Sequence, residues 1–341
     1  MKVLLYSQNW GHSRGVSYLC RSYVKALLKI GAEVTILCFK GVDKNEPEFD
    51  LPVKKIYNDD FWQVNREFFK EVLELEKPDY CFFFEYDQWR ENKDNLINIC
   101  LEKGVKPIGA WVAWERLFNR MIPNFKKFKK IFVFTKGQVK LFRKFGLTNT
   151  YYIPFGLDLD EFNNKHKEID DKIVFLHTSG YGGIGKRRNT EAVIKAYKLI
   201  EDENTSLIMT SQNVQTLPYD EIKKLYSDAD CYLSPSKWEG LGIPNVESIV
   251  SGTPVITTNF LPMNEIVSEN KTGLLVDADD FKKSEEIGIE QQIINPNDLA
   301  EKMKIIKNKM IREILYKGCK EERKRFSLDN MSKELEKELR W

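Results

Sequence analysis

The sequence has no CxxC pair and no long apolar run, and each absence excludes a class of protein. Its six cysteines are scattered, whereas a zinc site or a redox dithiol needs closely spaced pairs. We therefore expect reduced, mostly buried thiols. No stretch reaches the roughly 18 apolar residues of a membrane-spanning helix. The apolar start, Lys2–Tyr6, is too short for a secretory signal and lacks its cleavage site, so we expect a cytoplasmic protein.

An excess of charge of one sign is also lacking. The 341 residues carry 53 Lys and Arg against 51 Asp and Glu, which leaves a formal net charge of +2. A dedicated nucleic-acid binder usually shows a clear basic excess, so we expect no nucleic-acid partner. Hydrophobic residues make up 42% of the chain and charged residues 30%. This composition and length are typical of a globular protein with room for two domains.

Two segments of the chain begin alike, with an apolar strand, a glycine-containing loop and an amphipathic helix. The first comprises Lys2–Tyr6, Gly11–Gly15 and Val16–Ile30, and a strand at Glu33–Phe39 follows at once. The second opens with a strand at Lys172–Leu176. Strand, helix and strand in this order predict a parallel, right-handed βαβ unit. Such units place their glycine loops at the carboxyl edge of the sheet.

Strands and helices go on alternating in both halves. In the first half we expect strands at Tyr80–Phe84, Pro107–Val112, Lys130–Phe134 and Tyr151–Pro154, with helices at Asn65–Glu76 and Lys93–Lys103. In the second half we expect strands at Ser206–Thr210, Asp230–Ser234 and Pro254–Thr258, with helices at Thr190–Ile200, Tyr219–Tyr226 and Val246–Ser251. A polar linker, Phe155–Asp171, separates the halves. The alternation predicts two doubly wound α/β domains facing a cleft.

The densest signal for chemistry is the segment Trp238–Glu247 (WEGLGIPNVE). It follows a strand and opens a helix whose first turn contains a proline, where no N–H is needed. The N–H groups of that turn, with those of Leu241 and Gly242, predict an anion-binding pocket. Glu239 and Glu247 flank this loop, so we expect both to face one ligand. The alternative is a capped helix with two solvated glutamates.

A second signal is the glycine-rich loop Gly180–Arg188 (GYGGIGKRR). Its glycines satisfy the G-x-G-x-x-G fingerprint of dinucleotide-binding enzymes. The next strand, however, lacks the acidic residue that would hold a ribose. The three successive basic residues that end the loop suit a leaving diphosphate, whose charge must be stabilised. A solvated helix start is the alternative.

These motifs together resemble those of the retaining glycosyltransferases of family 4. The resemblance is carried by the E-x7-E element from Glu239 to Glu247, and by segments on either side of it: Ser227–Ser236 (SDADCYLSPS), Ser251–Ile256 (SGTPVI), Thr272–Asp277 (TGLLVD) and, more weakly, Ile153–Asp158 and Phe326–Asn330. As a set these motifs are specific, and they touch most of the chain from Ile131 onward.

The resemblance implies a fold and a reaction. The fold is GT-B, with an acceptor-side Rossmann-like domain at residues 1–155 and a nucleotide-sugar-binding one at 157–320. A helix at 321–341 crosses back to the first domain. The implied enzyme is a hexosyltransferase. It moves a hexose-type sugar from a GDP- or UDP-sugar to a hydroxyl of a glycan, lipid-linked or other acceptor. The anomeric configuration is retained, and neither a metal nor a cofactor is needed.

The resemblance also implies residue roles. Glu239 would contact the donor sugar and stabilise positive charge at the anomeric carbon, and Glu247 would hold the ribose. Lys186, Arg187 and Arg188 would stabilise the leaving diphosphate. The other implied donor-binding residues are five glycines and a leucine: Gly15, Gly182, Gly183, Gly240, Leu241 and Gly242.

The N-terminal half departs from the family pattern. Paired glycines are common in the family's first loop, where this chain has Arg14–Gly15. A histidine often follows the fourth strand, where this chain reads Trp111–Glu115 (WVAWE). His12, Arg14 and Glu115 are therefore the candidates for acceptor-side chemistry.

Three other functions stay open at this point. One is a non-catalytic subunit of the same fold, favoured by the missing histidine. Another is an NAD-dependent enzyme that uses Gly180–Gly185. The third is a phosphorylase or a nucleotide-sugar epimerase of similar architecture.

A short basic segment, Asn124–Lys130 (NFKKFKK), interleaves two phenylalanines with four lysines. This pattern predicts either peripheral contact with an anionic membrane or an ordinary solvated helix. D-x-D patterns such as Asp277/Asp279 occur in metal-dependent transferases. Here they fall at the edges of strands or helices, and we expect no metal site.

Overall fold

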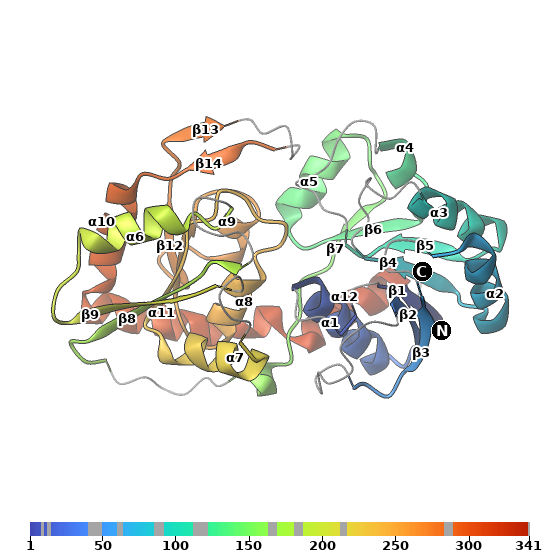
Figure 1. Cartoon of the computed structure of the whole chain (residues 1–341), viewed down its shortest axis with the longest axis horizontal. Helices are drawn as coiled ribbons and strands as arrows, with labels where there is room; N and C mark the ends of the chain where they lie inside the picture. The colour runs from blue at the N-terminus through green and yellow to red at the C-terminus, as the bar shows by residue number, and fades with distance from the viewer. Residues whose placement is uncertain are drawn as a thin grey trace. The chain divides into compact units, whose positions relative to one another are not determined.

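The computed structural model describes residues 1–7, 10–11, 15–39, 50–59, 64–84, 92–111, 122–162, 169–180, 187–211, 217–282 and 289–339. The chain divides into two compact units (Figure 1). The first comprises Met1–Gly156 together with Leu328–Trp341, and the second comprises Leu157–Ser327. The second unit thus extends seven residues beyond position 320, the end of the domain expected from the sequence.

The first unit is built on a seven-stranded sheet in the order β3-β2-β1-β4-β5-β6-β7. Its strands are β1 (Lys2–Tyr6), β2 (Glu33–Phe39), β3 (Lys54–Asn58), β4 (Tyr80–Phe83), β5 (Lys106–Gly109), β6 (Lys130–Val133) and β7 (Thr150–Tyr152). All of these strand pairs are parallel. The strand order reverses between β1 and β4, as it does in doubly wound sheets.

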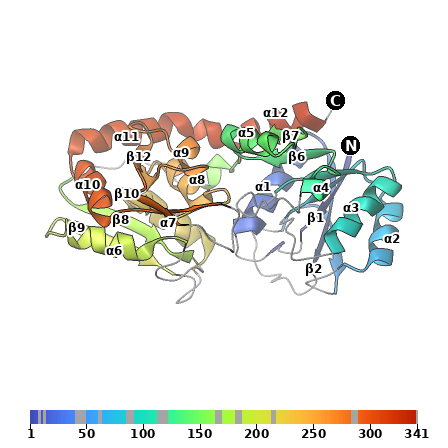
Figure 2. The ribbon, with the colours of Figure 1, turned by 90° about the horizontal axis from the view of Figure 1, so that it is seen from above.

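Helices connect the strands of the first unit: α1 (Gly15–Lys29), α2 (Arg66–Glu76), α3 (Asn92–Glu102), α4 (Ile122–Phe125) and α5 (Lys136–Lys144). α2 and α3 lie side by side (Figure 2), and Lys103, just after α3, pairs with Glu74 of α2 at 2.6 Å. The central strands β1 and β4 are buried, apart from Lys2 at the start of β1, because α/β crossovers cover both faces of a parallel sheet.

The C-terminal helix α12 (Leu328–Leu339) packs on the first unit, as predicted from the resemblance. The Ser332 hydroxyl donates to the carbonyl of Ala26 in α1 at 3.2 Å. The Tyr80 hydroxyl donates to the Leu339 carbonyl at 2.6 Å, and Lys130 pairs with Glu338 at 2.8 Å. The helix is therefore held to the first unit along its whole length.

The second unit contains a five-stranded parallel sheet in the order β12-β11-β10-β8-β9. The strands are β8 (Ile173–Thr178), β9 (Thr205–Thr210), β10 (Cys231–Ser234), β11 (Val255–Thr258) and β12 (Gly273–Val276). An antiparallel hairpin of β13 (Asp280–Lys282) and β14 (Gln291–Ile293) follows β12. The helices are α6 (Thr190–Lys198), α7 (Tyr219–Asp228), α8 (Ile243–Val250), α9 (Met263–Ile266), α10 (Pro296–Ile306) and α11 (Lys309–Glu322).

The core of the second unit joins three helices to the sheet. Val193 of α6, Met303 of α10 and Leu315 of α11 are buried in one cluster with Phe175 of β8 and Ile256 of β11. The α/β class with two Rossmann-like sheets is thus confirmed. All six cysteines are buried and free, as expected. Among the described residues, no helix combines the length and the apolar character needed to cross a bilayer.

Candidate functional site

Both loops singled out from the sequence start at the same edge of the second unit's sheet. β8 ends at Thr178 and leads to Gly180, whereas β10 ends at Ser234 and leads to the segment Trp238–Glu247. β8 and β10 are hydrogen-bonded neighbours, and the strand order reverses between them. Doubly wound sheets bind their ligands at such a switch point, outside the carboxyl ends of the strands.

Glu239 is the centre of the site. Its side chain is only 3% exposed and accepts hydrogen bonds from three neighbours. Arg188 Nη1 donates to Oε1 at 2.5 Å, and Ser236 Oγ donates to the same oxygen at 2.9 Å. Arg187 Nη1 pairs with Oε2. Two of the three predicted basic residues therefore converge on the predicted catalytic carboxylate.

The arginines keep Glu239 ionised despite its burial. Burial has the largest influence and would raise the pKa of Glu239. The charges of Arg187 and Arg188, with the hydrogen bond from Ser236, outweigh it and lower the pKa below its usual value. Two guanidinium groups against one carboxylate leave one positive charge in excess. That excess suits the binding of an anion.

The loop after Glu239 has a glycine that lets a ligand come close to its backbone. Gly242 caps α8 with a φ of +79°, in the left-handed region that favours glycine. A Cβ at this position would lie 3.3 Å from the Ile266 side chain. No described residue accepts a hydrogen bond from the backbone N–H of Leu241, Gly242 or Ile243. Unpaired N–H groups at the start of a helix are a typical setting for binding an anion.

Glu247 lies on α8 in the opposite electrostatic setting. It is 5% exposed, and the Tyr219 hydroxyl donates to its Oε1 at 2.6 Å. Burial, the largest influence, raises the pKa of Glu247, and the hydrogen bonds from Tyr219 and Tyr226 only partly offset it. The alternative of two solvated glutamates is therefore wrong, because both side chains are buried.

The sequence analysis missed the two tyrosines. Tyr219 and Tyr226 lie seven residues apart on α7, so they share one face of the helix, and both are buried. Their spacing of two helical turns indicates a shared buried face. It does not indicate that their partner is a glutamate on another helix.

The remaining predicted residues divide into three groups. Gly240 follows Glu239 directly in the second unit and is buried. Gly15 is the first residue of α1, in the first unit. The others lie outside the described residues: His12, Arg14, Glu115, Gly182, Gly183 and Lys186. Arg188 is 9% exposed, so it does not belong to a solvated helix start.

The phenylalanines of the segment 124–130 belong to the core of the first unit. Phe125 is fully buried and stacks on Phe142, with a centroid distance of 6.4 Å. Phe128 meets Phe83 edge-on, with a centroid distance of 5.8 Å. Lys126 and Lys129 are the exposed lysines of this segment, and the rings do not form part of an exposed surface.

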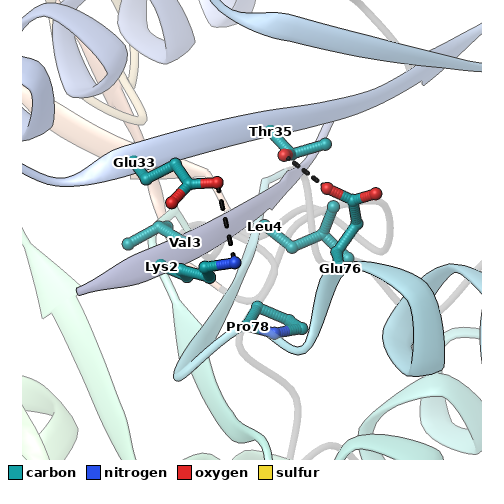
Figure 3. Close-up of a pocket in the computed structure, with 7 residues that line it drawn as sticks. All are labelled: Lys2, Val3, Leu4, Glu33, Thr35, Glu76 and Pro78. Carbon is teal, nitrogen blue, oxygen red and sulfur yellow. Dashed lines mark hydrogen bonds and ion pairs between the residues drawn. The ribbon is translucent and has the colours of Figure 1, made fainter.

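The first unit has a small hollow beside the amino ends of its strands (Figure 3). It is lined by Lys2, Val3, Leu4, Glu33, Thr35, Glu76 and Pro78. Lys2 pairs with Glu33 at 3.7 Å, and the Thr35 hydroxyl donates to Glu76 at 3.0 Å. The hollow lies at the amino ends of β1 and β2, away from the ligand-binding edge of such sheets. We assign it no role in function.

Known proteins resemble this chain both in sequence and in structure. Residues 203–310 match the family described as glycosyl transferases group 1. An uncharacterized glycosyltransferase of Methanocaldococcus jannaschii is 26% identical over 328 residues, covering 92% of this chain and 78% of that protein. The capsular polysaccharide biosynthesis glycosyltransferase CapM of Staphylococcus aureus is 26% identical over 203 residues, covering 50% and 52%. The crystal structure of Anabaena HepE with UDP and glucose superposes with a TM-score of 0.71 at 13% identity, covering 99% of both chains.

The two doubly wound sheets and the returning helix define a protein of the GT-B fold. The matching family segment contains Glu239, Glu247 and the loop between them. The chain is a glycosyltransferase.

Proposed function

We propose that the chain is a retaining glycosyltransferase that binds a UDP- or GDP-hexose at the edge formed by Arg187, Arg188 and the start of α8. The observation that carries this proposal is the convergence of both arginines on the buried Glu239. The structure of Anabaena HepE holds UDP and glucose, and its likeness to this chain supports a nucleotide-sugar donor.

The exposure of the two arginines suggests how the leaving group is stabilised. The Arg187 side chain is 37% exposed, whereas that of Arg188 is only 10% exposed. Arg187 can therefore turn from Glu239 toward a bound diphosphate, while Arg188 stays in place. The N–H groups at the start of α8 add donors that need no reorganisation. Cationic side chains thus take the role that a metal ion has in other transferases.

Glu239 acts as a fixed anion in this proposal. Its lowered pKa keeps it from donating a proton. Its charge instead stabilises the positive charge that develops at the anomeric carbon as the diphosphate leaves. The leaving diphosphate deprotonates the acceptor hydroxyl on the same face of the sugar, so the anomeric configuration is retained. No covalent intermediate on a protein residue is required.

Glu247 holds the ribose of the nucleotide in this proposal. Its carboxyl already accepts a hydroxyl, that of Tyr219, at 2.6 Å. A ribose hydroxyl offers the same kind of donor. The acceptor is a hydroxyl of a glycan or lipid-linked sugar. The relationship to the capsular polysaccharide glycosyltransferase supports this class of acceptor.

In this proposal, contact with an anionic membrane depends on basic side chains and not on the phenylalanines of the segment 124–130. Residues 116–157 contain ten Lys and Arg and no Asp or Glu. Lys126 and Lys129 near α4, with Lys140 and Lys144 on α5, are exposed. A Cβ added to Gly146, just after α5, would lie 4.0 Å from Lys126 Nζ. The end of α5 therefore lies next to α4. The buried phenylalanines cannot insert, so binding depends on charge and is sensitive to salt.

Sedimentation with vesicles tests this contact. Vesicles of phosphatidylcholine with phosphatidylglycerol should bind the protein at low salt and release it at high salt. Pure phosphatidylcholine should not bind it. Replacing Lys126, Lys129, Lys140 and Lys144 by alanine should abolish the binding. Binding that persists in this variant would contradict the assignment.

A thermal-shift screen tests the donor site. The ligands are UDP, GDP, ADP, their common sugar conjugates and NAD. A ligand that binds only the folded state raises Tm in proportion to the logarithm of its concentration over Kd. We expect a shift with UDP or GDP that is lost in Glu247→Ala. A shift with NAD alone would favour a dehydrogenase instead. Donor binding without any sugar transfer would favour the non-catalytic subunit.

A further inference from the structure

Three segments far apart in the sequence are joined by backbone hydrogen bonds next to the site. The N–H of Gln292, in β14, donates to the carbonyl of Lys237 at 2.9 Å. The N–H of Lys237 donates to the carbonyl of Arg187 at 2.8 Å. Lys237 is thus held between the hairpin on one side and the arginine segment on the other.

This connection bears directly on the ion pair between Arg187 and Glu239. Arg187 lies outside any helix or strand, because α6 begins only at Thr190. Its charged partner Glu239 follows Lys237 by two residues. The hydrogen bond between Lys237 and Arg187 therefore sets the backbone of both members of the pair at the same time. The position of β14 in turn fixes Lys237.

The hairpin contributes little to the core, apart from the end of β14. All three residues of β13 are exposed, and the Phe281 side chain is 56% exposed. Gln292 is 1% exposed, and Ile294, just after β14, belongs to the core cluster. The N–H of Asp279 donates to the carbonyl of Ile293 at 2.9 Å and closes the base of the hairpin. The hairpin is thus fixed at its base, where it contacts Lys237.

We propose that the β13–β14 hairpin is a positioning element for Arg187, acting through Lys237. The proposal rests on the function proposed above, in which Arg187 meets the leaving diphosphate. Gln292 is a positioning residue through its backbone N–H, because it contacts neither the donor nor the reacting atoms. Small errors in the placement of a charged group reduce the rate more than they reduce donor binding.

The test is a proline at position 292. Gln292→Pro removes the N–H that bonds Lys237, whereas Gln292→Ala keeps it and loses only the side-chain bond to the Glu290 carbonyl. We expect Gln292→Pro to lower kcat about tenfold or more, with the Kd for UDP or GDP within about twofold of wild type. Gln292→Ala should reduce kcat much less than Gln292→Pro does. Phe281→Ala, on the exposed strand, should match wild type.

A double-mutant cycle with Arg187 separates positioning from a general loss of structure. If the hairpin acts through Arg187, Gln292→Pro should cause little further loss of kcat in an Arg187→Met background, because coupled residues are not additive. An equal loss in both backgrounds would overturn the proposal, and so would an unchanged kcat in Gln292→Pro. If wild type itself transfers no sugar, the proposed function fails instead.

A second variant covers the case in which the proline prevents folding. Asp279 and Ile293 are already hydrogen-bonded, so residues 280–292 can be replaced by two glycines that close the gap. This variant removes the contact with Lys237 and leaves Ile294 in the core. It should show the same loss of kcat, the same nucleotide affinity and the same non-additivity with Arg187→Met. A loss that adds fully to that of Arg187→Met would refute the proposal.

Discussion

Replacing Glu239 by glutamine removes the carboxylate that pairs with two guanidinium groups. The Arg188 side chain is 10% exposed, so its charge would be left with little water to replace the lost partner. Removing one member of a buried ion pair costs about 3–5 kcal/mol of the free energy of unfolding. The glutamine oxygen still accepts a hydrogen bond. We therefore expect a loss near the lower end, about 3 kcal/mol.

The same substitution should strengthen nucleotide binding. In the wild-type protein Arg187 and Arg188 are both engaged by Glu239. Without the carboxylate, their positive charge is available to a diphosphate. UDP or GDP should therefore raise the Tm of Glu239→Gln by more than it raises that of wild type, while sugar transfer falls strongly. The slower turnover is what the removal of a group that acts on the transition state predicts. The tighter binding has a separate cause, the positive charge that Glu239 no longer engages.

Urea denaturation and thermal shift, with and without nucleotide, measure both effects. Ser236→Ala is the matched control, because it removes only the hydrogen bond at 2.9 Å and leaves every charge in place. It should cost about 1.5 kcal/mol and leave the nucleotide shift unchanged. The reasoning is refuted if Glu239→Gln is as stable as wild type, or if its nucleotide shift is smaller.

Three further predictions concern the same site. Burial raises the pKa of Glu247 in the folded state, so its stabilising contribution is present at low pH and is lost as pH rises through the folded pKa. Glu247→Gln cannot ionise, and denaturation curves should show it gaining stability relative to wild type from pH 5 to pH 8; a constant difference would exclude this linkage. Arg187→Met should reduce kcat strongly and cost less than about 1 kcal/mol in urea denaturation, because this pair is partly exposed; a large loss of stability would mean that Arg187 is structural. Chelation of divalent metals should leave turnover largely intact, whereas complete loss would favour a metal-dependent mechanism.

The elements predicted correctly are those with strong local patterns. β4 is a continuous apolar run and is fully buried, so periodicity and flanking charge located it. β3 was missed because this edge strand, Lys54–Asn58, is only partly buried and begins with two lysines. α5 was missed because only Gln138 and Phe142 are buried in it. Its capping box, Thr135 with Gln138, was the readable signal. The three-residue strands of the β13–β14 hairpin gave no pattern at all.

The sequence pointed to individual residues of the candidate site, but it did not predict which of them contact one another. The sequence placed Glu239 before the loop and Glu247 on the helix, because a strand, a glycine loop and a helix follow one another there. Their partners come from far along the chain. Arg187 lies 52 positions before Glu239, and Tyr219 lies 28 positions before Glu247. Contacts at such separations depend on which strands are neighbours in the sheet, and local patterns do not encode that order.

Slow hydrolysis of the donor without acceptor tests the central claim most directly, because it requires no knowledge of the acceptor. Purified protein is incubated with UDP- and GDP-hexoses, and the release of nucleoside diphosphate is measured. The account predicts release from one of these donors by wild type, and strongly reduced release by Glu239→Gln despite its tighter nucleotide binding. Equal release by both proteins would contradict the role of Glu239. If wild type binds the nucleotide and releases nothing, even with glycan acceptors added, the claim that this site performs sugar transfer is wrong.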